Sequence, residues 1–81
     1  MAIFTDLEAR AASVRSNPDT LTVNLVDGRV LSVPLAWFPR LQQASQQDRD
    51  NWRLIGEGEG IHWESIDEDV SVPRLLGLPT D

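Results

Sequence analysis

The sequence predicts an α+β domain in which a small antiparallel sheet comes first and short helices follow and pack on it. Three observations support this prediction. Apolar and polar side chains alternate along residues 21–25, which is typical of a half-buried strand. Asp27-Gly28 then offers the turn chemistry of a tight hairpin before a second strand-like run at residues 29–33. Pro34 and Pro39 follow, and they favour the end of a strand and the first turn of a helix.

The N-terminal half is expected to form a three-stranded meander over residues 11–35. Asn17-Pro18-Asp19 is a turn signal, so it separates the hairpin from an earlier strand at residues 11–16 with Val14 as its apolar member. Residues 1–10 are either a frayed helical lead-in built on Phe4, Leu7 and Ala11 or a loose tail.

Helical segments are expected over residues 36–53. A short helix runs from Pro39 to about Ala44, and Ser45-Gln46-Gln47-Asp48 resembles a capping box that starts a second one, ending near Trp52. Residues 54–76 should hold short strands and a terminal helix. Two short strands flank the glycines at 56, 58 and 60, which indicate a turn or a close backbone approach. Ser71 is the expected cap of the last helix.

The length of 81 residues fits a single small domain spanning residues 1–81. The chain has no cysteine, which excludes disulfides and thiolate metal sites. It has no apolar run that would span a bilayer and no basic leader at its start, so we expect it in the cytoplasm. The formal charge is −6, and all seven basic residues are arginine. An acidic domain repels phosphate backbones, which argues against nucleic acid as a partner.

Several strings in the second half carry a specific resemblance. Trp37-Phe38-Pro39-Arg40-Leu41, Ile61-His62-Trp63 and Ile66-Asp67-Glu68-Asp69 stand in this order, and together with Asp27-Gly28-Arg29 they resemble the bacterial domain of unknown function family 2442 from about Leu21 to Leu76. The resemblance implies a small α+β domain without an established activity. In some relatives the domain precedes a helix-turn-helix segment, and other relatives are encoded beside a small partner in arrangements similar to toxin–antitoxin pairs.

His62 is the one histidine, and two interpretations of it stay open. In one, His62 is an acid–base residue of an enzyme and acts together with Asp67-Glu68-Asp69. The other, which we favour, is a surface or hydrogen-bonded histidine, because strand alternation turns Ile61 and Trp63 inward and His62 outward. One histidine with carboxylates is a poor zinc set, and the run lacks the spacing of a calcium loop. We therefore expect no metal, no cofactor and no catalysis.

The carboxylates between Glu57 and Asp69 stand in a segment with no arginine or lysine. The segment is either a solvated face or a docking surface for a basic protein partner. We favour a small non-catalytic interaction module, the antitoxin-like or regulatory member of a two-protein pair, and a small homo-oligomer is compatible with it. The expected partner-binding residues are Glu57, Glu59, Asp67, Glu68, Arg49, Trp52 and Trp63. A weaker alternative is a nucleic-acid-binding regulator with Arg49 and Arg53 on one helical face.

Large aromatic side chains dominate burial in small domains, so the tryptophans are expected in the core, with an aromatic patch that faces a partner as the alternative. In a regular strand Val30 and Leu31 cannot both face inward, so we expect one of the two to be assigned to the core in error. The predicted core is Val14, Leu21, Val23, Leu25, Val30, Leu31, Leu35, Trp37, Leu41, Trp52, Leu54, Ile61, Trp63, Ile66 and Leu75.

Overall fold

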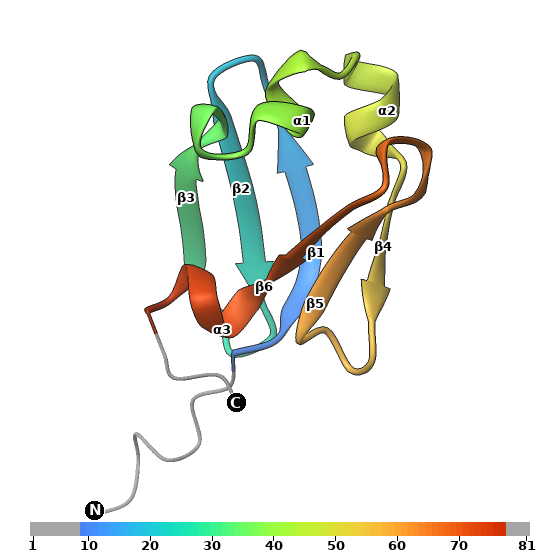
Figure 1. The fold of residues 1–81 in the computed structure, drawn as a ribbon. Coiled ribbons are helices and arrows are strands. Elements are labelled where there is room, and N and C mark those ends of the chain that lie inside the picture. The colour runs from blue at the N-terminus through green and yellow to red at the C-terminus, as the bar shows by residue number, and fades with distance from the viewer. Residues whose placement is uncertain (1–8, 78–81) are drawn as a thin grey trace, which may run out of the picture.

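The N-terminal meander is present in the computed structural model, which describes residues 9–77. Strands β1 (Ala11–Ser16), β2 (Thr20–Leu25) and β3 (Val30–Pro34) form an antiparallel sheet in the order β1-β2-β3 (Figure 1). Val23 lies opposite Leu31, and the alternation turns Leu31 toward the core and leaves Val30 59% exposed. Of Val30 and Leu31, Val30 is therefore the residue whose assignment to the core is wrong. The lead-in predicted for residues 1–10 lies mostly outside the described residues.

Three short helical elements follow β3 at one end of the sheet. They are the 3-10 helix η2 (Leu35–Trp37) and the α-helices α1 (Pro39–Gln43) and α2 (Gln46–Asp50). The Ser45 side chain accepts a hydrogen bond from the backbone N–H of Asp48, which confirms the predicted cap. The predicted end of α2 near Trp52 is wrong, because Trp52 is already the first residue of a strand.

A second antiparallel sheet is built from β4 (Trp52–Ile55), β5 (Gly60–Trp63) and β6 (Glu68–Ser71), in the order β4-β5-β6. The sequence predicts the first two of these strands. It does not predict β6, because Val70 is the only buried apolar side chain of that strand, and one such side chain shows no alternation. The 3-10 helix η3 (Glu64–Ile66) joins β5 to β6, and helix α3 (Val72–Leu75) follows β6 with Ser71 as its cap.

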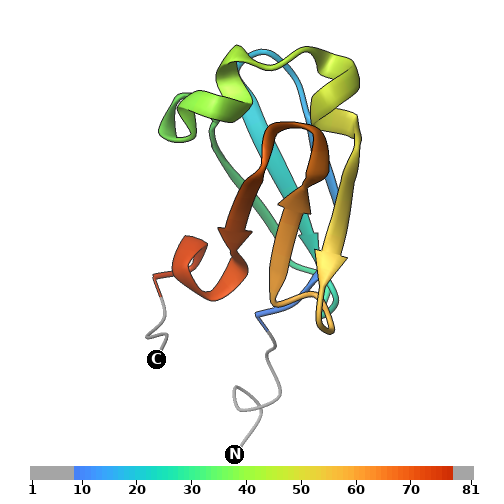
Figure 2. The same ribbon diagram turned by 45° about the vertical axis from the view of Figure 1, so that its right-hand side comes forward.

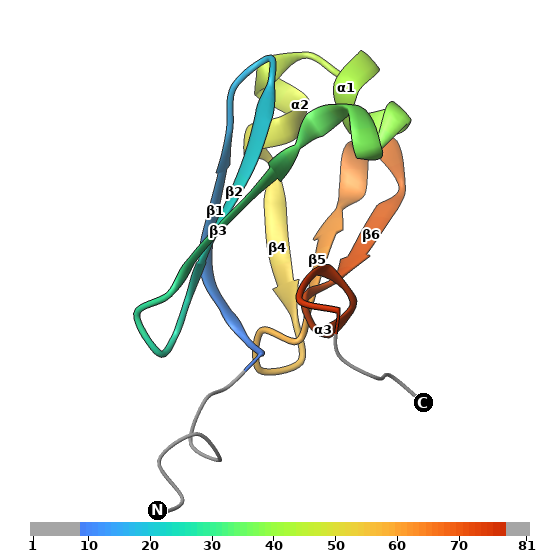
Figure 3. The ribbon, with the colours of Figure 1, turned by 90° about the vertical axis from the view of Figure 1, so that its left-hand side faces the viewer.

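The two sheets face each other, with α1 and α2 at one end and α3 at the other (Figures 2 and 3). The buried residues form one cluster to which both sheets contribute. The sequence misses four of its members: Ala11, Val33, Val70 and Val72. Trp37 is the main residue that the sequence analysis places in the core and the structure does not, because it is 63% exposed. No helix within residues 9–77 is long and apolar enough to cross a membrane.

The turn between β4 and β5 joins the two sheets on one side of the molecule. The N–H of Ala11 in β1 donates to the carbonyl of Gly58 at 2.7 Å. Gly58 has a φ of +101°, and a Cβ there would lie 2.5 Å from the carbonyl oxygen of Ala11. This is the close backbone approach that the glycine run predicts. At the opposite edges, β3 and β6 belong to separate sheets and do not pair.

Candidate functional site: a groove along the edge of β6

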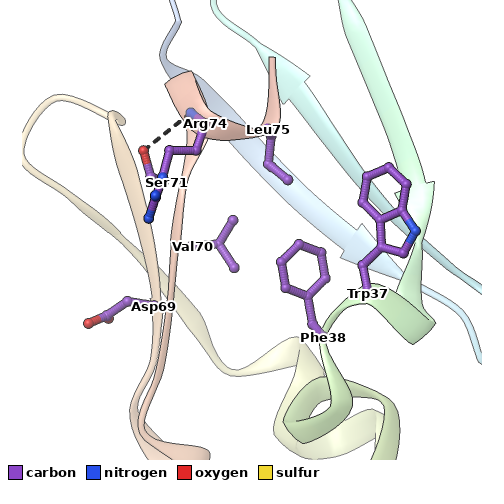
Figure 4. Close-up of a pocket in the computed structure, with 7 residues that line it drawn as sticks. All are labelled: Trp37, Phe38, Asp69, Val70, Ser71, Arg74 and Leu75. Atoms are coloured by element: carbon purple, nitrogen blue, oxygen red, sulfur yellow. Dashed lines mark hydrogen bonds between the residues drawn. The ribbon is translucent and has the colours of Figure 1, made fainter. Parts of the chain in front are cut away.

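A groove of about 290 Å³ lies between β6, α3 and the segment that follows β3. It is lined by Trp37, Phe38, Asp69, Val70, Ser71, Arg74 and Leu75. In Figure 4 the side chains of Val70, Leu75 and Phe38 converge on the space between β6 and η2, Trp37 stands on its far side, and Asp69 points away from it. The groove therefore has apolar walls and charged groups at its rim.

Trp37 is exposed because of how η2 is held. Leu35 is fully buried, and its N–H donates to the carbonyl of Asp19 at 2.9 Å. Successive residues of a 3-10 helix are about 120° apart, so a buried Leu35 turns Trp37 away from the interior. Phe38 then packs against the core from the groove side. The result is a large aromatic side chain held by a short, anchored element at the mouth of the groove.

The other wall is an edge strand. Successive side chains of a strand point to opposite faces, yet Asp69, Val70 and Ser71 all line the groove. Because the Asp69 side chain points away from the groove (Figure 4), Asp69 lines it with its main chain, so the groove reaches the outer edge of β6. The carboxylate of Asp69 is bonded to His62. Arg74 is exposed, and its guanidinium has no ion pair or hydrogen bond to the part of the chain that is described.

His62 lies beside this edge on the outer face of the second sheet. Its Nδ1 lies 2.5 Å from Asp69 and its Nε2 3.3 Å from Glu64, and Glu64 also faces Arg53 at 3.5 Å. The outward orientation predicted from strand alternation is confirmed. Both ring nitrogens face carboxylates of the protein, an arrangement that links β5 to β6 and to η3.

Of the three carboxylates expected beside His62, Asp69 contacts its ring, whereas Asp67 and Glu68 lie elsewhere. Glu68 is opposite Trp63 in the ladder, so it belongs to the other face of the sheet from His62. Asp67 adopts the left-handed conformation with a φ of 52°, and its carbonyl accepts a hydrogen bond from Arg40. The acid–base set of His62 with Asp67 and Glu68 is therefore not assembled. Residues 9–77 contain no group of three histidine, cysteine or acidic side chains arranged to hold a metal.

Two of the residues expected to bind a partner are buried. Trp63 has no exposed surface and Arg49 is 7% exposed. The Arg49 guanidinium donates to Ser16 Oγ, Gln46 Oε1 and the carbonyls of Leu41 and Ala44. Arg49 and Trp63 thus hold the fold together. Arg49 and Arg53 do not share a helical face, because Arg53 lies in β4.

The acidic segment is divided in space. Glu57 and Glu59 occupy the β4–β5 turn, whereas Asp67 and Glu68 follow η3 at the other end of β5. Arginines offset part of the charge, as Arg10 lies 3.0 Å from Glu57. The acidic side chains therefore form two separate groups. Trp52, the remaining expected anchor, is half-buried against the core.

The groove is the feature that sequence reasoning misses, because Trp37 is assigned to the core. A usable signal lies in the spacing of Pro34 and Pro39. The four residues between them make one short turn, which cannot bury Leu35, Trp37 and Phe38 together.

Two facing three-stranded sheets with short helices at their ends define a small α+β domain. Here an aromatic groove lies between the unpaired edge of β6 and the segment that follows β3. The chain belongs to the family described as protein of unknown function (DUF2442), whose model matches residues 11–78. A crystal structure of a protein of unknown function from Rhodospirillum rubrum ATCC 11170 is similar, with a TM-score of 0.72 and 31% sequence identity. The similarity covers 89% of this chain and 90% of that one. No curated protein matches the chain.

Proposed function

We propose that this chain is a small protein-interaction module that binds its partner at the groove beside Trp37. The observation that carries the proposal is the 63% exposure of Trp37 at the mouth of an apolar groove. A large exposed aromatic beside a pocket is the kind of residue that dominates protein–protein binding energy. Ser71 and Arg74 at the rim supply polar groups for orientation.

The net charge suggests the overall character of the partner. With a formal charge of −6, the domain attracts a partner with a basic surface and raises its association rate. Glu57 and Glu59 at one end of β5, and Asp67 and Glu68 at the other, are the carboxylates assigned this steering role. They act at a distance and need no direct contact, which is consistent with their separation.

The resemblance in sequence supports a narrower version of the proposal. Relatives encoded beside a small partner suggest a regulatory, antitoxin-like member of a two-protein pair, acting in the cytoplasm. The cysteine-free sequence fits a reducing compartment.

A quantitative pull-down from the native host tests the interaction. Three baits are compared: the unchanged chain, Trp37→Ala and Val30→Ala. Val30 is a matched control, because it is also exposed but does not line the groove. The proposal expects a protein retained by the unchanged chain and by Val30→Ala and lost with Trp37→Ala. Equal recovery with all three baits would contradict it.

A further inference from the structure

We propose that the partner contributes an extended segment that adds to the edge of β6, with a large apolar side chain in the groove and a neighbouring carboxylate at Arg74. This inference rests on the proposed function and names the mode of binding at the same site. It is drawn from the hydrogen-bond register of β6, the shape of the groove and the charge of its rim.

The register determines which backbone groups of β6 are directed outward. The N–H of Val72 donates to the carbonyl of Glu59 at 2.9 Å, and Val72 follows the ladder pair of Ser71 with Gly60. Hydrogen-bonded and non-hydrogen-bonded pairs alternate along an antiparallel ladder. The pair of Val70 with Ile61 is therefore hydrogen-bonded, whereas Asp69 and Ser71 belong to the non-bonded pairs.

As a result, the N–H and C=O of Asp69 and the N–H of Ser71 point away from β5. This is the side on which the groove lies, since both residues line it. β6 is the last strand of its sheet, so these groups form an open template for one more strand. Main-chain hydrogen bonds at such an edge bind an extended peptide, and adjacent pockets select its side chains.

The groove selects one apolar side chain of the added strand. Phe38, Val70 and Leu75 converge beside the edge, and Trp37 closes the far side (Figure 4). Every second side chain of an added strand points to the same face. One of them enters the groove beside Val70. Its immediate neighbours in the partner sequence project to the opposite side of the strand, the side to which the Arg74 side chain extends in Figure 4.

Charge complementarity indicates which residue of the partner stands next to the apolar one. Arg74 lines the groove, and its guanidinium makes no ion pair with the residues that the structure describes. The carboxylate of Asp69 is already bonded to His62. The unmatched charge at the rim is therefore positive, and an arginine is suited to grip a carboxylate through two parallel hydrogen bonds. The docked segment is thus locally acidic and apolar, even if the partner as a whole is basic.

The experiment begins with selection of short random peptides displayed on phage against the full chain. The enriched peptides are expected to share Asp or Glu next to a large apolar residue. The best peptide is then labelled and titrated by fluorescence anisotropy beside an amide version, with Asn or Gln in place of the acid. Two further versions carry N-methyl groups at alternate positions, one for each of the two edges of the peptide strand.

The expected result is specific to each change. Arg74→Gln weakens the acidic peptide about tenfold and leaves the amide peptide unchanged, while Arg15→Gln, at another exposed arginine, alters neither. One N-methylated version fails to bind and the other binds normally. Trp37→Ala abolishes binding of both the acidic and the amide peptide.

Other outcomes overturn the inference in distinguishable ways. Peptides that need Trp37 but tolerate Arg74→Gln and both N-methylated versions would refute strand addition and leave the proposed function standing. Peptides that bind Trp37→Ala as well as the unchanged chain would refute both. Concentration-dependent self-association that is lost in Trp37→Ala, measured by sedimentation velocity, would assign the edge to a second copy of this chain and overturn the inference.

Discussion

The indole N–H of Trp63 in β5 donates to the backbone carbonyl of Arg49 at 2.9 Å, where α2 ends. Both side chains are buried. The Arg49 guanidinium in turn donates to the carbonyls of Leu41 and Ala44. Because buried carbonyls need donors, these two residues together satisfy the backbone of α1 and α2 and tie both helices to the second sheet.

Trp63→Phe should lower the free energy of unfolding by about 2 kcal/mol, since it removes a buried hydrogen bond and part of a buried ring. Trp37→Phe is the matched control at an exposed tryptophan, with an expected change within about 0.5 kcal/mol. Urea denaturation followed by circular dichroism measures both. Equal effects would mean that Trp63 does not hold α2 in place.

Arg49→Met should destabilise the fold by about 2–3 kcal/mol, because the carbonyls of Leu41 and Ala44 lose their charged donor. Arg15→Met changes an exposed arginine of β1 and should stay within about 0.5 kcal/mol. Urea midpoints with unchanged slopes provide the comparison. If the two variants are equally stable, the account of Arg49 as a structural residue is wrong.

Gly58→Ala and Gly28→Ala separate backbone strain from steric contact. Both glycines have a positive φ, +101° and +95°, but a Cβ on Gly28 meets nothing within 4 Å, whereas one on Gly58 meets the Ala11 carbonyl. Gly28→Ala should cost about 1 kcal/mol of left-handed strain. Gly58→Ala should cost clearly more, because β1 must move away from the β4–β5 turn. Thermal unfolding of both variants tests the difference. Similar melting temperatures would show that β1 moves away from a Cβ at position 58 at little energetic cost.

Neutralising both acidic groups, with Glu57→Gln, Glu59→Gln, Asp67→Asn and Glu68→Gln in one variant, should slow association with a basic partner about tenfold at low salt and flatten the salt dependence. The dissociation rate should stay unchanged. Trp37→Ala should do the reverse and raise the dissociation rate. Stopped-flow or surface binding kinetics separate the two. An unchanged association rate in the neutralised variant at every salt concentration would make these carboxylates ordinary solvated surface.

The elements that sequence reasoning predicts are those with a strong local signal. Asp27-Gly28 marks the hairpin, Ser45 and Ser71 cap helices, and alternation orients His62. The parts it misses depend on tertiary contacts. Strand β6 has one buried apolar residue, Val70, and is recognised only by its pairing with β5.

The same limit applies to the candidate site. Trp37 and Trp63 are the same residue type, and their opposite burial follows from the anchoring of Leu35 and from the position of β5 between two strands. Arg49 looks like a surface residue of a polar helix and is buried because α1, α2 and β1 surround it. Residue type alone is therefore not enough to locate the groove or to identify Arg49 as a structural residue.

The most direct test of the binding face is site-specific photo-crosslinking in the native host. A photoreactive phenylalanine derivative is placed at Ala36, an exposed neighbour of Trp37, and in a matched chain at Val30 on the outer face of β3. We expect one discrete crosslinked protein from position 36 that is absent from position 30 and disappears when Trp37→Ala is added. Identical crosslinking patterns from both positions, or a product at position 36 that persists with Trp37→Ala, would contradict the claim that the groove beside Trp37 is the binding face.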